Sequence, residues 1–209
     1  MASIFPPHRA SARNRSKDIS LAANPFVDRL IRQGATSQKL QFAAACAERS
    51  AGVLFWAASL DDRMADADLY GQILDKLWSG VAKEGEWDRL VERIEGTSDL
   101  VDGHERGGAY SYAFSAGALM HSCLNFARSM FPSGLPGIAE EATNNASRIG
   151  FRVGVNLIDE ELSEQMRDAN AVLLSAAMPS AVDLLRERAR TIGRGRLSAL
   201  KKWGDENGL

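Results

Sequence analysis

The sequence has little of what exported, disulfide-bonded or membrane-embedded proteins need. It holds only two cysteines, Cys46 and Cys123, each within an apolar helical pattern, which indicates buried thiols in a reducing compartment rather than a disulfide framework. No apolar run reaches the roughly 18–20 residues that span a bilayer. The opening stretch MASIFPPHRASARNRSKD lacks the apolar core of a secretory signal. We therefore expect a cytoplasmic protein with no membrane partner.

The motifs of common enzyme and nucleotide-binding folds are also missing. The sequence contains no glycine-rich phosphate loop, no GxSxG nucleophile motif and no CxxC or HxxE ligand spacing. The acidic run at residues 61–68 lacks the glycine and the closing glutamate of a calcium loop. We accordingly predict no catalytic residue, no cofactor and no metal ion, and we lean towards a protein that is not an enzyme.

What the sequence does have is helical periodicity, on an ordinary globular composition that is 45% hydrophobic and 25% charged. Apolar residues recur every three or four positions, and capping signals such as Asn24-Pro25 mark where helices begin. No segment alternates polar and apolar residues for long, so strands are not expected. The pattern predicts an all-α, single-domain helical bundle of about seven to nine helices. The apolar segment from Ala109 to Phe131 is its expected central helix, and Gly52 is expected to bend or break an earlier one.

Composition divides the chain into three parts. Residues 1–23 combine Pro6-Pro7 with scattered arginines and few apolar anchors, which predicts a basic arm that is flexible or docked. Residues 24–193 carry the periodic segments and form the helical domain. Residues 194–209 are rich in Arg and Lys and are expected to form a basic helical extension.

Charge is strongly segregated, although the formal net charge is only −2. Residues 61–106 hold thirteen acidic against six basic residues, and residues 138–183 hold eight against three. Residues 1–20 hold four basic against one acidic residue, and residues 184–209 hold seven against three. An acidic body argues against nucleic acid as the partner and suits a basic protein. Alternatively, the arginines near the end pair with the acidic segment around Glu160 to Glu164.

Four segments resemble one known family, over roughly residues 25 to 190: CAERSAGVLFWAAS, DADLYGQILDKLW, RIEGTSD and AYSYAFSAGALMHSCL. The most specific pieces are the Cys-x-Glu-Arg of Cys46 to Arg49, and Leu69-Tyr70 followed by Ile73-Leu74-Asp75 and Trp78. They resemble the YjaG-like family (domain of unknown function 416), whose members are small, all-helical bacterial proteins without an assigned activity. The resemblance implies the fold and yields no mechanism. The basic arm, the Arg/Lys-rich end and His104-Glu105-Arg106 depart from the family pattern.

Glu48 and Arg49 lie side by side in an otherwise apolar segment. Adjacent helical residues point about 100° apart, so the two do not form one ion pair. Each needs its own partner if it is buried, because an unpaired buried charge costs several kcal/mol. We interpret Glu48, Arg49 and Asp75 as a structural clamp in which Arg49 reaches Asp75 on the following helix. The alternative is a binding or catalytic role.

Three classes of function stay open. The first is a non-enzymatic protein-binding module, in one form an immunity protein that neutralises a basic toxin through an acidic surface. Its contact surface would consist of Asp61, Asp62, Asp66, Asp68, Asp159, Glu160, Glu161 and Glu164. The second is an enzyme or metal-binding protein with an interhelical site made from Glu48, Asp75, His104 or His121, although a buried, hydrogen-bonded role suits His121 better. The third is a structural homodimer whose seam is the small-residue segment from Ala139 to Gly154.

Overall fold

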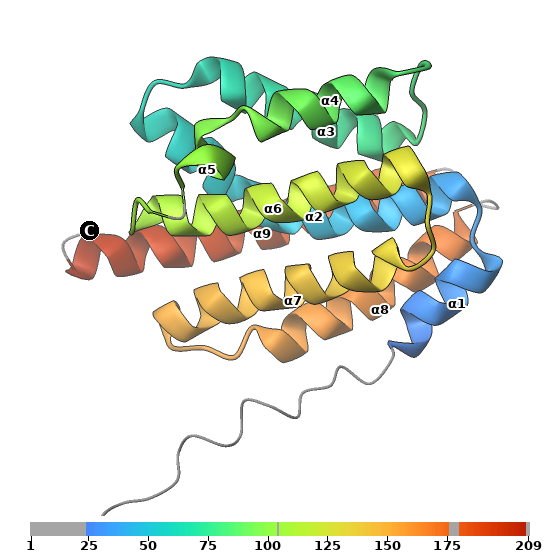
Figure 1. Ribbon diagram of the computed structural model, residues 1–209. Helices are drawn as coiled ribbons and strands as arrows, with labels where there is room; N and C mark the ends of the chain where they lie inside the picture. Colours follow the sequence, from blue (N-terminus) through green and yellow to red (C-terminus); the bar gives the residue numbers. More distant parts are fainter. Residues whose placement is uncertain (1–23, 104, 176–179, 208–209) are drawn as a thin grey trace, which may run out of the picture.

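The computed structural model describes residues 24–103, 105–175 and 180–207, and within them the chain forms nine helices and no strand (Figure 1). The helices are α1 (Pro25–Gln33), α2 (Thr36–Leu60), α3 (Met64–Ser79), α4 (Glu86–Glu95), α5 (Ser98–Val101), α6 (Ala109–Ser129), α7 (Gly134–Val153), α8 (Ile158–Leu174) and α9 (Ser180–Asn207). This confirms the predicted all-α bundle. The predicted basic arm and His104 lie outside the described residues. None of the described helices is both long enough and apolar enough to cross a membrane.

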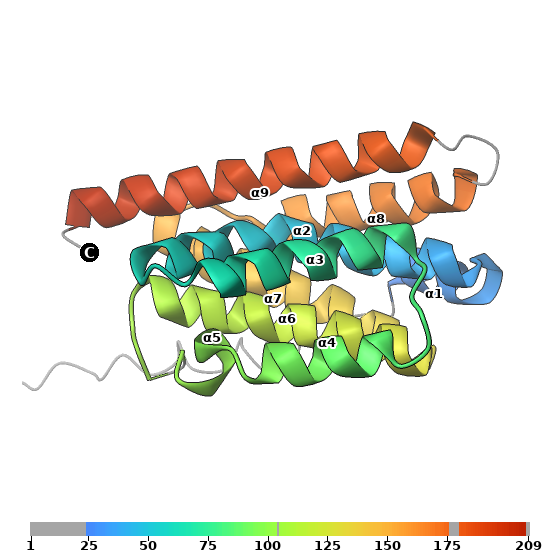
Figure 2. The ribbon, with the colours of Figure 1, turned by 90° about the horizontal axis from the view of Figure 1, so that it is seen from above.

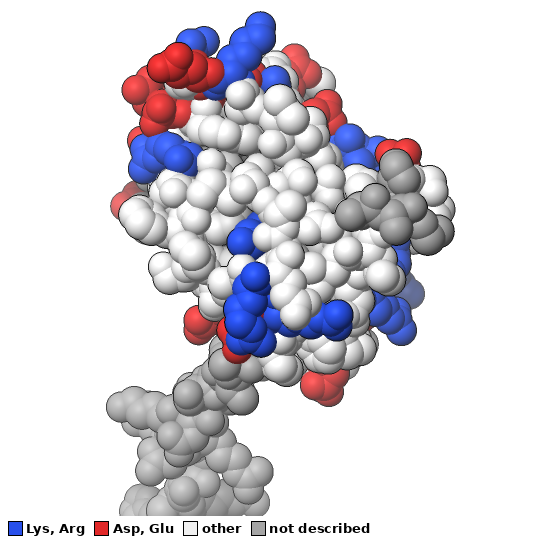
Figure 3. Space-filling view, turned by 90° about the vertical axis from the view of Figure 1, so that its right-hand side faces the viewer, with Lys and Arg blue, Asp and Glu red and all other residues white. Residues whose placement is uncertain are grey.

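The helices stack in three layers (Figures 1 and 2). The middle layer consists of α2, α6 and α9, with α3, α4 and α5 on one side of it and α1, α7 and α8 on the other. The first helix begins where its cap was predicted, since the Asn24 side chain accepts hydrogen bonds from the backbone N–H groups of Phe26 and Val27. Viewed from the end that carries α1, the surface is largely uncharged, and charged side chains gather mostly at its margins (Figure 3).

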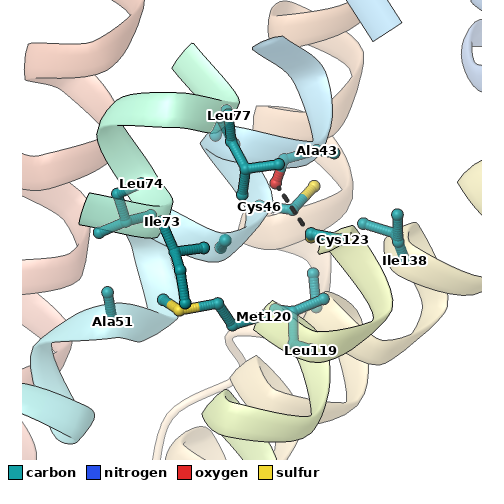
Figure 4. Close-up of a cluster of buried hydrophobic side chains, with 14 of the residues drawn as sticks. Ala43, Cys46, Ala51, Ile73, Leu74, Leu77, Leu119, Met120, Cys123 and Ile138 are labelled. Carbon is teal, nitrogen blue, oxygen red and sulfur yellow. Dashed lines mark hydrogen bonds between the residues drawn. The ribbon is translucent and has the colours of Figure 1, made fainter. Parts of the chain in front are cut away.

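The central helix is α2 and not the expected α6. It is buried along most of its length, and it contacts α3, α6, α7, α8 and α9. A run of alanines from Ala43 to Ala47 lets these neighbours approach closely. Around it pack leucines and isoleucines of α3, α6 and α7, with Met120 and Cys123 of α6 (Figure 4). Helices α2 and α6 are about equally apolar, and the small side chains of α2 let its neighbours approach it closely.

The helix α2 also runs unbroken past Gly52, contrary to the sequence expectation. Gly52 faces α9, where an added Cβ would lie 3.3 Å from the Leu197 side chain. The complementary contact comes from Gly193 of α9, where an added Cβ would lie 3.0 Å from the backbone oxygen of Glu48. The two glycines let α2 and α9 approach each other closely, so here glycine serves packing and not a bend.

The structure shows no boundary at residue 194. The helix α9 runs continuously from Ser180 to Asn207, and both Arg196 and Leu200 are buried against the rest of the domain. The predicted extension is thus the second half of a packed helix.

The proposed homodimer seam is likewise used inside the fold. Ala139, Ala142, Ala146 and Gly150 are all buried, where α7 packs against α2, α6 and α8. An added Cβ on Gly150 would meet the backbone oxygen of Val155 at 2.6 Å. The buried small residues of this helix serve intramolecular packing and are not available for a dimer seam, whereas the homodimer itself stays a prediction.

Candidate functional site

Arg49 lies at the centre of a buried ion-pair network. Its Nε donates to Glu161 Oε2 at 2.9 Å and its Nη2 to Glu161 Oε1 at 2.6 Å, a two-pronged pair. A third donor, Nη1, bonds Asp168 about two turns further along α8. Burial alone would raise the pKa of Glu161, but the Arg49 and Arg196 guanidinium groups hold it below its ordinary value. Arg49 therefore ties α2 to α8 and not to Asp75, which the sequence had suggested.

The arginines of α9 complete this network. Arg196 Nη1 donates to Glu161 at 2.8 Å and its Nη2 to Glu160 at 2.9 Å. Arg188 pairs with Glu164 at 3.1 Å and donates to Asp168 at 2.5 Å. This confirms the alternative in which the basic end of the chain pairs with the acidic segment around Glu160 to Glu164.

The predicted acidic contact surface on α8 is accordingly corrected. Glu161 is 0% exposed and Glu164 is 5% exposed, and both are neutralised by arginines, so neither can meet a partner protein. Glu160 is exposed but paired with Arg196, and the exposed Asp159 accepts a hydrogen bond from Asn156. Most of the negative charge of α8 is thus neutralised inside the molecule by arginines of α2 and α9.

Glu48 and Asp75 face α9 on the other side of α2. Glu48 Oε2 accepts from the Trp78 indole N–H at 2.8 Å, and its Oε1 accepts from Arg190 Nε at 2.9 Å. Asp75 pairs with Arg186. These side chains border an open groove of about 360 Å³ between α2, α3 and α9. Arginines of α9 pair with both carboxylates. Neither carboxylate is therefore left unpaired for a ligand that enters the groove.

The acidic run between α2 and α3 is only partly free. Asp61 accepts from Arg106 at 2.8 Å and from the Tyr110 hydroxyl at 2.7 Å, and these bonds lower the pKa of Asp61 to about 2. Asp66 accepts from Arg63 at 2.7 Å. Only two of the four, Asp62 and Asp68, are exposed and form no ion pair with any described residue.

Arg63 also binds a carboxylate that the sequence did not single out. It donates to Asp99 Oδ1 at 2.9 Å, and the Tyr70 hydroxyl donates to the same carboxylate at 2.6 Å. Asp99 is 1% exposed. The bonds hold α3 and α5 together.

The structure brings two residues of the enzyme alternative together and keeps a third apart: Glu48 and Asp75 line one groove, and His121 does not. His121 bonds Glu95 at 2.9 Å on the α4–α6 side and is half-buried, more exposed than expected, while Glu48 and Asp75 lie beside α9. His104 lies outside the described residues. Across the described parts of the chain, no three His, Cys, Asp or Glu side chains are grouped as metal ligands would be.

The most ligand-like cavity was not predicted from the sequence. It measures about 270 Å³ and lies where α2 and α9 end and α6 begins, at the end of the bundle marked C in Figure 1. Its lining is mostly apolar and contains four aromatic rings, all half-buried. The lining residues are Trp56, Leu60, Gly107, Gly108, Ala109, Tyr110, Tyr112, Leu200, Trp203 and Gly204. We call this cavity the aromatic pocket.

Three cations lie over rings that line the aromatic pocket. The Arg106 guanidinium is 3.4 Å from the centre of the Tyr110 ring, that of Arg152 is 5.0 Å from the centre of Trp203, and Lys201 Nζ is 5.3 Å from the centre of Trp56. Arg152 Nε also donates to the Tyr112 hydroxyl at 3.0 Å. The pocket thus combines an apolar lining with cations that lie against three of its rings without belonging to the lining themselves.

No protein-family model, curated protein or solved structure matches this chain. The resemblance to the YjaG-like family therefore stays a prediction. Within the structure, residues of the segments that carry the resemblance connect helices to one another. Arg49 binds α8, Trp78 bonds Glu48, and Tyr70 bonds Asp99.

Proposed function

We propose that this chain is a non-enzymatic binding protein and that the aromatic pocket is its binding site. The observation that carries the proposal is the pocket itself: an apolar concavity, close in size to small ligand sites, with a few polar groups at its rim. A cytoplasmic location is part of the proposal, and the two free, buried thiols support it.

The pocket leaves aromatic surface in contact with water that a ligand would cover. Trp56, Tyr110, Tyr112 and Trp203 are half-buried, although large aromatic side chains gain most from complete burial. Each Å² of apolar surface removed from water contributes about 25 cal/mol. The space beside Gly107 at the pocket is open, since an added Cβ there would meet nothing within 4 Å. The geometry therefore favours an apolar ligand.

The test uses n-octanol as a neutral apolar probe and the indole N–H signals of the four tryptophans as the readout. We expect the signals of Trp56 and Trp203 to shift on titration, while that of Trp78, which bonds Glu48, stays in place. Ala109→Phe should fill the pocket and abolish the shifts, whereas Ala199→Phe, at an exposed position of α9, should not. Equal movement of all four signals, or none, would refute the proposal.

A protein partner is the second candidate, favoured by the turn between α2 and α3. There the large apolar side chains of Leu60 and Met64 are 53% and 63% exposed, beside the uncompensated Asp62 and Asp68. Exposed apolar groups next to carboxylates suit a basic protein, such as the toxin that an immunity protein neutralises.

This candidate is tested by capture from the cell lysate at low and at high salt. Asp62→Asn/Asp68→Asn should lose a basic protein that the wild type retains at low salt, and Asp183→Asn, exposed at the start of α9, should keep it. Equal capture by wild type and the double variant would exclude this surface.

A further inference from the structure

We infer that the ligand of the aromatic pocket is an amphipathic organic anion: an apolar chain or ring that ends in a carboxylate or a similar group. The inference rests on the proposed function, because it assigns the ligand class of the same site. An apolar body would occupy the aromatic interior, and its anionic end would lie at the rim beside Arg152 and Lys201.

The charge balance of the rim supports this assignment. Arg106 is neutralised by Asp61, which accepts two hydrogen bonds from it. Arg152 and Lys201, in contrast, form no ion pair with any residue that the structure describes, and each lies over a tryptophan ring of the pocket. Two positive charges beside the pocket therefore have no counter-charge among the described residues.

The setting of these two cations differs from that of the arginines on α9 that face α2 and α8. Arg186, Arg188, Arg190 and Arg196 each bind a carboxylate. Arg152 and Lys201 have no such partner among the described residues, and they lie over rings of the aromatic pocket. An anionic ligand would supply the missing partner.

The start of α6 adds to the positive potential. The backbone at Gly108 and Ala109 borders the pocket, and the helix begins there without a side-chain cap. Uncapped N–H groups at a helix start favour negative charge. The carboxylates at the end of α9, Asp205 and Glu206, are exposed to solvent. Glu206 pairs weakly with Lys202, at 3.9 Å.

A ligand cation is the main competing possibility, because clusters of aromatic rings also bind quaternary ammonium groups. Here the two tryptophan rings already carry Arg152 and Lys201 close to their faces. A third cation in the same cavity would be repelled by both of them. The occupied ring faces thus favour an anion over a cation.

The experiment compares three probes with the same apolar body: octanoate, n-octanol and octylammonium, each titrated at low salt. We expect octanoate to bind about tenfold more tightly than octanol, because two partly exposed charge pairs together contribute a difference of about this size. Octylammonium should bind most weakly. Added salt should remove most of the preference, because it screens exposed charges.

Single substitutions test which cations cause the preference for octanoate over octanol. Arg152→Gln and Lys201→Gln should each reduce the ratio of octanoate affinity to octanol affinity. Taking the ratio separates the loss of charge from any effect of the variant on the shape of the pocket. Lys202→Gln, which removes a neighbouring exposed cation outside the pocket, should leave both affinities unchanged.

The outcomes separate the two proposals. Equal binding of octanol and octanoate, or tightest binding of octylammonium, would overturn the anion assignment and leave the pocket as a binding site. Failure of all three probes to shift the Trp56 and Trp203 signals would overturn the proposed function as well.

Discussion

Replacing Arg49 by methionine should destabilise the domain more than almost any other single substitution outside the apolar core. The side chain is 1% exposed, and its removal would leave Glu161 with Arg196 alone and Asp168 with Arg188 alone. Breaking a buried ion pair by deleting one partner costs about 3–5 kcal/mol when the remaining charge is left without compensation. Here each of the two carboxylates loses one of its two arginines, so we expect a loss of up to about this size. Since domains of this kind are stable by only about 5–15 kcal/mol, the loss would be a large fraction of the total.

Urea denaturation measures this change in the free energy of unfolding. If the slope of the free energy against urea concentration is the same for both proteins, they unfold from comparable states. Lys202→Met, which breaks an exposed pair, is the matched control and should leave the midpoint nearly unchanged. Adding Glu161→Gln and Asp168→Asn to Arg49→Met should recover part of the loss, because the unpaired charges disappear.

The destabilisation should also depend on pH. In the wild type the pKa of Glu161 is lowered, so its stabilising contribution is present at neutral pH and is lost as the pH falls through the folded-state pKa. Without Arg49, Arg196 alone would lower this pKa against the effect of burial, so the stabilising contribution of Glu161 at neutral pH would be smaller. The difference between the two proteins should therefore widen from acidic to neutral pH. A loss below about 1 kcal/mol at neutral pH would refute the reasoning.

Three further predictions concern other contacts. Gly193→Ala should cost about 1–3 kcal/mol in the free energy of unfolding, because its Cβ would press on α2, whereas Gly195→Ala, with open space around it, should be neutral or stabilising. Tyr70→Phe should cost about 1–2 kcal/mol by the same assay, because the buried Asp99 loses a hydrogen-bond donor. Both buried thiols, whose pKa values burial raises, should react with iodoacetamide only as fast as the protein unfolds; rapid alkylation of the native protein would contradict their burial.

The helices were predictable because their signals are local. Apolar spacing and the Asn24-Pro25 cap depend on neighbours in sequence, and the structure agrees with both. The position of α2 was not predictable in the same way. Hydrophobicity pointed to α6, whereas the centre of the bundle is taken by the helix whose small side chains let five others approach it. At Gly52 the local tendency to break a helix was overridden by close packing against α9.

The sites depend on contacts that no local pattern contains. Arg49 and Glu161 are 112 positions apart, so the sequence showed that Arg49 needed a partner but not which one it would have. The rings of the aromatic pocket come from α2, α6 and α9, and each has an ordinary helical setting on its own. The only signal for this pocket in the sequence is that tryptophan and tyrosine occur near the ends of several predicted helices.

The pairing between α8 and α9 also affects how the protein is made. The carboxylates that α9 neutralises on α2, α3 and α8 all emerge from the ribosome before their arginines do. Until Arg188 and Arg196 are available, docking α8 onto α2 would bury carboxylates that are only partly compensated, which is costly. A nascent chain that stops short of α9 should therefore keep α8 undocked. We therefore expect the domain to close when its basic helix arrives, which would couple synthesis and final packing through charge.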